Sequence, residues 1–301
     1  MNDQSSRPDR FYASSRQYLL PADKMETKRL DKQHDMLTAL FGGSLSVAPT
    51  YLTTGDRVLE SAAGSGIWAL QFFERNRAKG ITLDIECIDM SSAQFPANHP
   101  TQVHFSVNSV ANLPNPEWSD MFSYAHQRLL VGAANDSLWR TAVAELYRVL
   151  KPGGWVELVE LQARDVGSWS VGPNSARLGA LLGTLFDAKG VIEDFSVYLP
   201  EILQEAGFVN VKCEPRRASV GGELLDDTFP SHTKTGYESG MLGDLWAAMK
   251  GPVVESGGYG IVDTAEEYEA LVKASVREWK ASKEAYTTFY AIVGQKPIAD
   301  D

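Results

Sequence analysis

Short apolar segments alternate with helix-like segments through the first half of the chain, and this alternation constrains the fold more than any other feature. The predicted strands are 57–60, 83–90, 103–107, 122–126 and 155–161, with two more at 209–214 and 286–293. Strands that alternate with helices predict a parallel sheet with helices on both faces. We therefore expect an α/β fold with a doubly wound, mostly parallel sheet of seven strands.

The predicted helices set the organisation of the chain. They cover 23–41, 45–52, 67–77, 137–150, 172–189, 197–206, 237–250 and 265–282, with Asp136 as the expected N-cap of the fourth and a polar stretch at 215–235. We expect a disordered N-terminus at 1–15, an N-terminal helical lid at 16–54 and a nucleotide-binding core at 55–161. Residues 162–285 would complete the core and add a helical cap, and 286–301 would form a closing strand and tail.

Composition limits the partners. The net charge is -11, which disfavours nucleic acid because an acidic surface repels phosphate. No apolar run approaches the ~20 residues that span a bilayer, and the polar start of the chain lacks a signal-peptide core. We expect a cytoplasmic protein, with the nucleus as an alternative, no membrane partner, and a monomeric or homodimeric state. The two cysteines, Cys87 and Cys213, are predicted to be buried strand residues rather than metal ligands, and no metal site is expected.

A glycine-bearing turn, Glu60-Ser-Ala-Ala-Gly-Ser-Gly66, joins the first strand of the core to a helix. Glycine lets a ligand approach the backbone N–H groups at a helix start, and Asp89 ends the next strand, where a carboxylate can hold ribose hydroxyls. A dinucleotide could satisfy this pattern, and so could a tight turn without any ligand. Glu60 favours a ligand with an ammonium group, because an acid there would repel a pyrophosphate.

Further motifs carry a resemblance to a known family. The turn Lys151-Pro-Gly-Gly154 before the fifth strand resembles a signature of the class I S-adenosylmethionine (SAM) dependent methyltransferases. The segments 18–23, 26–34, 64–68, 122–128 and 152–160 resemble the fungal LaeA-like methyltransferases. The resemblance covers 18–161 well, is only an outline over 162–285, and returns in the final strand. It implies a Rossmann-like core at 55–161 that binds SAM and releases S-adenosylhomocysteine, with the acceptor region in 162–285.

The resemblance also implies roles for individual residues. Glu60 would open the SAM turn, Asp89 would bind ribose, and Met90 would pack on adenine. The residues implied at the cofactor are Tyr18, Glu60, Ala62, Gly64, Gly66, Asp89, Met90, Asn108, Ser109, Val110 and His126.

Three positions depart from the family pattern. Ala62 replaces the usual first glycine of the turn, which is tolerable if its φ is negative. Ser109 replaces the adenine-binding Asp, and Ser123 replaces a common Asp of the fourth strand.

His126 is the predicted catalytic base, because it ends a central strand and histidine titrates near neutral pH. The alternatives are that it only lines the pocket or bonds to the backbone. His34 is expected to close the cofactor site, Tyr18 to close over the methionyl carboxylate, and Arg128 to pair with Glu160.

The predicted function is methyl transfer to O, N or S of a small secondary metabolite, apolar or aromatic. Three alternatives stay open. The chain could be a regulatory protein that works through partner proteins. It could catalyse a cyclisation or rearrangement, with SAM absent or bound as a cation. An NAD-dependent oxidation is disfavoured by Glu60 and by the 151–154 turn.

Overall fold

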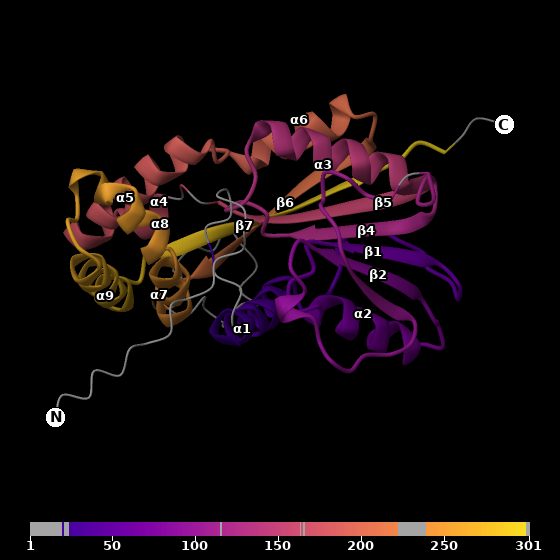
Figure 1. Cartoon of the computed structure of the whole chain (residues 1–301), viewed down its shortest axis with the longest axis horizontal. Helices are drawn as coiled ribbons and strands as arrows, with labels where there is room; N and C mark the ends of the chain where they lie inside the picture. The colour runs from indigo at the N-terminus through magenta and orange to yellow at the C-terminus, as the bar shows by residue number, and fades with distance from the viewer. Residues whose placement is uncertain are drawn as a thin grey trace.

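A seven-stranded sheet forms the centre of the molecule in the computed structural model, which describes residues 20, 24–114, 116–162, 164, 166–221 and 239–298 (Figure 1). The strands are β1 Arg57–Ser61, β2 Asp84–Asp89, β3 Val103–Val107, β4 Phe122–Arg128, β5 Leu150–Leu161, β6 Val209–Ser219 and β7 Tyr286–Gln295. Their order is β3-β2-β1-β4-β5-β7-β6, and only β7 runs antiparallel to its neighbours. The predicted Rossmann-like, mostly parallel sheet is confirmed.

The strand order reverses between β1 and β4, and this arrangement positions the ligand site. β1 continues to β2 on one side and pairs with β4 on the other. In open α/β sheets a crevice forms at such a reversal, beyond the carboxyl ends of the strands. The register sets Glu60 beside His126 there.

Helices cover both faces of the sheet. α2 Ile67–Arg77 lies on one side, and α3 Asp136–Val149 and α6 Phe195–Glu205 lie on the other (Figure 1). Each side has its own buried apolar cluster, which includes Trp68 of α2 on one side and Trp139 of α3 on the other. α1 Lys24–Leu40 crosses below the carboxyl edge of the sheet. No helix among the described residues is long and apolar enough to cross a membrane.

The remaining helices gather at one end of the sheet (Figure 1). They are α4 Val166–Trp169, α5 Pro173–Lys189, α7 Ser239–Ala248, α8 Lys250–Glu255 and α9 Ala265–Ala281; the short turns η1 Ser92–Gln94 and η2 Gly257–Gly260 complete the helical segments. A third apolar cluster joins these helices to the ends of β5 and β7 and to Leu37 and Leu40 of α1. Hence α1 packs against the cap as well as the core.

Three local predictions were wrong. Residues 45–52 form no helix, because the buried Glu157 carboxylate accepts the N–H groups of Val47 and Ala48, each at 2.9 Å, and holds the segment in an irregular conformation. β6 continues into the predicted polar stretch, paired with β7 as far as Ser219. The N-cap of α3 is Asn135, whose side chain accepts the N–H of Leu138.

Candidate cofactor-binding site

A cavity of about 680 Å³ opens at the carboxyl edge of β1, β2 and β4, between the sheet, α1 and the cap. Its volume falls in the range of clefts that hold a drug-sized ligand. One set of lining residues is polar and one is apolar. The polar set includes Arg29, Gln33, His34, Glu60, Asp89, Gln94, Ser109 and Arg128; the apolar set includes Leu20, Leu37, Leu129, Leu161, Phe186, Leu245, Trp246 and Met249.

The glycine turn lies directly under α1. Gly64 and Gly66 have φ of 55° and 71°, a region that favours glycine. A Cβ on Gly66 would lie 2.5 Å from the Phe105 ring, and one on Gly64 would lie 3.2 Å from Leu30 of α1. Both positions therefore disfavour a side chain, and Gly64 lines the cavity.

Ala62 also lines the cavity, but its φ is 55°. The condition of a negative φ is therefore not met. A left-handed alanine costs roughly 1–2 kcal/mol, because its Cβ crowds the following carbonyl. The turn holds this conformation although the usual glycine is missing.

Asp89 joins the turn to the end of β2. One carboxylate oxygen accepts the N–H of Gly64 at 2.9 Å, and the other accepts the N–H of Ser91 at 3.1 Å. Burial raises the pKa of Asp89, and these backbone N–H bonds act in the opposite direction. The carboxylate is thus fixed at the cavity wall.

Glu60 and His126 form a buried pair. His126 Nδ1 lies 2.5 Å from Glu60 Oε2, and the imidazole stacks on the Trp68 indole with centroids 3.8 Å apart. Burial raises the pKa of Glu60 and lowers that of His126, because it disfavours the charged form of each group. Glu60 reaches the cavity, whereas His126 is 1% exposed and lies outside its lining.

The predicted Arg128–Glu160 pair is wrong. Glu160 instead accepts the N–H groups of Leu130 and Val131, at 2.8 and 3.0 Å, so it orders the loop that follows β4. Arg128 donates to His34 Nδ1 at 3.2 Å. Because a guanidinium only donates, His34 must be neutral at that nitrogen, in agreement with burial and the Arg128 charge lowering the pKa of His34.

The remaining predicted residues divide between the cavity and its surroundings. Met90, Ser109 and Val110 line the cavity together with Ala62, Gly64, Asp89 and Glu60, whereas Asn108 and Gly66 do not. The Asn108 amide donates to Ser106 Oγ at 2.8 Å. Tyr18 lies outside the described residues.

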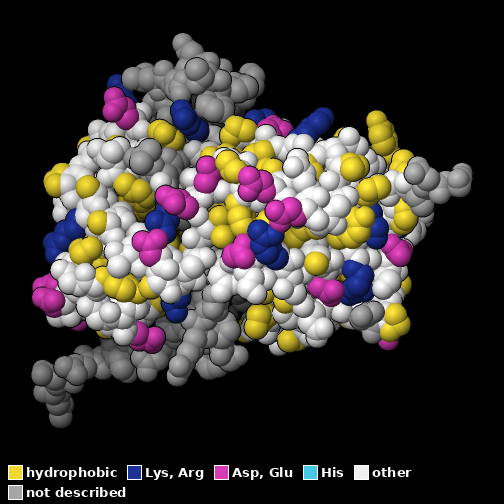
Figure 2. Space-filling view, turned by 90° about the horizontal axis from the view of Figure 1, so that it is seen from above, with side chains coloured by type: hydrophobic (Ala, Val, Ile, Leu, Met, Phe, Trp, Pro, Cys, Tyr) yellow, Lys and Arg dark blue, Asp and Glu magenta, His cyan; other side chains and the backbone are white. Residues whose placement is uncertain are grey.

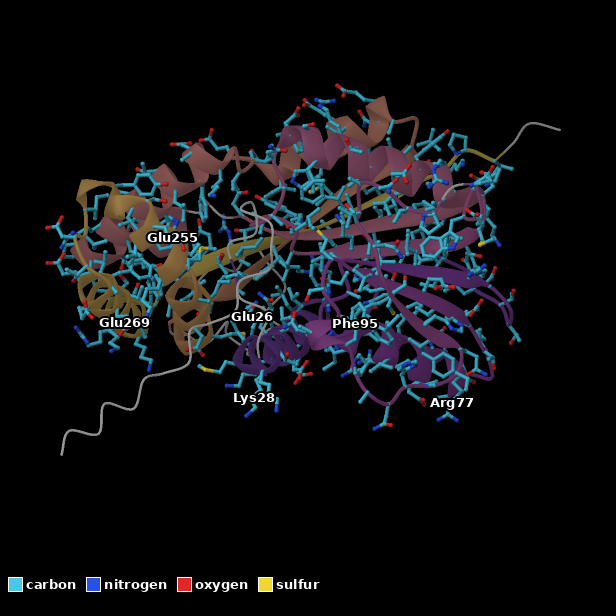
Figure 3. The ribbon with its side chains drawn as sticks, viewed as in Figure 1. Glu26, Lys28, Arg77, Phe95, Glu255 and Glu269 are labelled. Carbon is cyan, nitrogen blue, oxygen red and sulfur yellow. The ribbon has the colours of Figure 1, made fainter. Side chains whose placement is uncertain are left out.

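Sequence reasoning missed the polar face of α1. Glu26, Arg29 and Gln33 are buried on the inner side of this helix, and Lys28 projects from the opposite side (Figure 3). The signal was the spacing of Arg29 and Gln33, four residues apart and in register with Leu37. Over the face seen in Figure 2, basic side chains are interspersed with acidic ones, without a continuous basic patch.

Comparison with known proteins identifies the family. A methyltransferase-domain family model matches residues 12–213. The chain is 35% identical over 229 residues to the methyltransferase grgD of a Penicillium species, covering 70% of this chain and 75% of that protein. It is 34% identical over 145 residues to the N-methyltransferase sirN of Leptosphaeria maculans, covering 48% and 49%. It is 29% identical over 157 residues to the secondary metabolism regulator LAE1 of Hypocrea atroviridis, covering 50% and 43%.

The chain therefore belongs to the class I SAM-dependent methyltransferases. The chain spans about half or less of the lengths of sirN and LAE1, and three quarters of grgD. Within the class, it belongs with the fungal LaeA-like methyltransferases.

SAM is the cofactor of this family, and the cavity fits it. The turn lines the cavity at Gly64 without a side chain, and Glu60 offers a carboxylate to an ammonium group. Asp89 ends β2, where ribose hydroxyls could be held, and Met90 beside it is 58% exposed.

Proposed function

We propose that this protein transfers the methyl group of SAM to a small apolar metabolite bound against the cap. The observation that carries the proposal is the two-part lining of one continuous cavity. Its polar part surrounds the glycine turn, and its apolar part is formed by residues such as Leu161, Phe186 and Trp246. A cavity with both parts can hold a charged donor and an apolar acceptor in contact.

When bound, SAM supplies a methyl group already activated by the sulfonium. The chain's own task is then to orient the two reactants and to exclude water. α1 supports this role, because it lies on the glycine turn through Leu30 and packs against the cap through Leu37.

We propose that His126 acts on Glu60 rather than on the acceptor. Its imidazole is sealed beneath Trp68 and lies outside the cavity lining, which does not suit the earlier hypothesis of a general base. The hydrogen bond to Glu60 instead holds that carboxylate at the cavity wall. In this assignment His126 is a positioning residue.

The acceptor atom is O, N or S. The name of sirN, an N-methyltransferase, favours nitrogen among the three. Methyl-labelled SAM incubated with the protein and small-molecule extracts should yield labelled products by mass spectrometry. Calorimetry with SAM, S-adenosylhomocysteine and NAD provides the matching binding test, and binding of NAD alone would contradict the proposal.

A regulatory role is the second candidate, and the likeness to LAE1 is the observation that favours it. SAM binding without labelled products from any extract, together with a protein partner recovered by pull-down, would favour this alternative. Labelled small molecules would favour the enzyme.

A further inference from the structure

We propose that Arg128 and Gln33 form a carboxylate-binding subsite which, with Glu60, recognises the α-amino acid end of the cofactor. The inference rests on the SAM-binding function of the cavity. It adds a residue-level account of how the methionyl group is held at the junction of α1 and β4.

Arg128 is a cation that forms no close ion pair within the described part of the chain, although Glu60 and Glu157 act on its charge from a longer range. No carboxylate within the described part of the chain lies within 4 Å of its guanidinium, whose one hydrogen-bond partner there is the neutral His34. Arg29, also on the cavity wall, differs because it forms an ion pair with Glu26 at 2.6 Å. The Arg128 donors that face the cavity have no carboxylate within hydrogen-bonding distance among the described residues, so they suit a negatively charged ligand group.

Gln33 supplies a second polar group that lacks a hydrogen-bond partner among the residues the structure describes. Its side chain is 3% exposed and lines the cavity, and its amide forms no hydrogen bond to any residue that the structure describes. It precedes His34 on α1, so it comes from the helix that orients Arg128. An amide has two N–H donors, which suits a carboxylate already bound by a guanidinium.

Glu60 gives the subsite its selectivity. Its neighbour across the strands is His126, and Arg128 lies two residues further along β4. Adjacent strands are about 4.8 Å apart. Glu60 and Arg128 therefore lie near the same sheet edge, where their charges attract each other, while the close partner of Glu60 is His126. An α-amino acid carries an ammonium and a carboxylate on one carbon, and this pair of wall charges is complementary to it.

The test compares ligands that differ by one charged group. Calorimetry measures the affinity of the full chain for SAM and for decarboxylated SAM, which keeps the ammonium and lacks the carboxylate. We expect wild type to prefer SAM by about 10-fold or more, the scale of a charged hydrogen bond. Arg128→Gln should lose this preference while its affinity for decarboxylated SAM changes less than about 3-fold. Gln33→Leu should reduce the preference by a smaller factor.

Two controls keep the outcomes separate. Arg77→Gln changes an exposed arginine remote from the cavity and should leave both affinities unchanged (Figure 3). Thermal melting shows whether each variant folds. Equal weakening of both ligands by Arg128→Gln would assign Arg128 to the scaffold and overturn the subsite. Unchanged SAM affinity in that variant would overturn it too, and would point to a carboxylate on the acceptor. Failure of wild type to bind SAM at all would instead contradict the cofactor assignment.

Discussion

At the scale of single residues, Ala62 is a strained position in an otherwise glycine-favouring turn. Its φ of 55° puts an L side chain in the left-handed region. Ala62→Gly should raise the free energy of unfolding by about 1 kcal/mol, because the relief of strain outweighs the added entropy of the unfolded chain. Urea denaturation measures this change. A loss of stability would show that packing of the Ala62 methyl outweighs the strain.

Substitutions of His126 distinguish a positioning role of this residue from a catalytic one. Removing it should free the Glu60 carboxylate, so His126→Ala should weaken SAM binding by about 1–3 kcal/mol, the range for a lost charged hydrogen bond. His126→Asn places an amide donor near the position of Nδ1 and should recover part of that affinity. If SAM affinity stays at the wild-type level in the alanine variant while kcat falls, the general-base hypothesis would regain support.

At the scale of elements, the loop after β4 depends on one buried carboxylate. Glu160 accepts two backbone N–H groups there, and burial raises its pKa to about 8 from an ordinary value of 4.5. A pKa raised by folding means that the native state holds a proton the unfolded chain releases. Its stabilising contribution is complete below about pH 4.5 and is lost as the pH rises through about 8.

Glu160→Gln tests this linkage. Wild type should lose more stability than the variant between about pH 5 and about pH 8, since the amide does not titrate in that window. The variant should be less stable at every pH, because an amide nitrogen faces a backbone donor. Urea denaturation at several pH values provides the comparison. Glu60 and Glu157 titrate in both proteins, so parallel pH profiles would contradict the assignment to Glu160.

The boundary of one strand explains why the site was only partly predictable. Strand alternation and the glycine turn follow from local periodicity and φ preferences, and both were found in the sequence. β4, however, ends at Arg128 rather than at His126. Because the strand is two residues longer than predicted, His126 lies below the sheet edge and Arg128 reaches the cavity. Strand ends depend on tertiary pairing, here with β5, which local patterns do not contain.

At the scale of the whole molecule, the proposed function assigns the cofactor to the sheet edge and the acceptor to the cap. Asp89, at the end of β2, borders the polar part of the cavity, and Leu245 of α7 borders the apolar part. These two residues come from distant parts of the chain. The cofactor role of Asp89 was predicted from the sequence, whereas Leu245 was not singled out, because the family resemblance is weakest over the cap.

Two variants, one at each part of the cavity, test whether the cofactor and the acceptor bind to different walls. Asp89→Asn should weaken SAM binding by about 1–3 kcal/mol, because a charged acceptor becomes neutral, and should leave the KM of the acceptor nearly unchanged. Leu245→Phe adds volume to the apolar wall and should raise the acceptor KM by about 10-fold or more, with SAM affinity within about 2-fold of wild type. Calorimetry and steady-state kinetics measure the two effects, with melting curves as the control for folding. If the phenylalanine variant instead lost SAM affinity, the apolar wall would belong to the cofactor, and the acceptor would have to bind elsewhere.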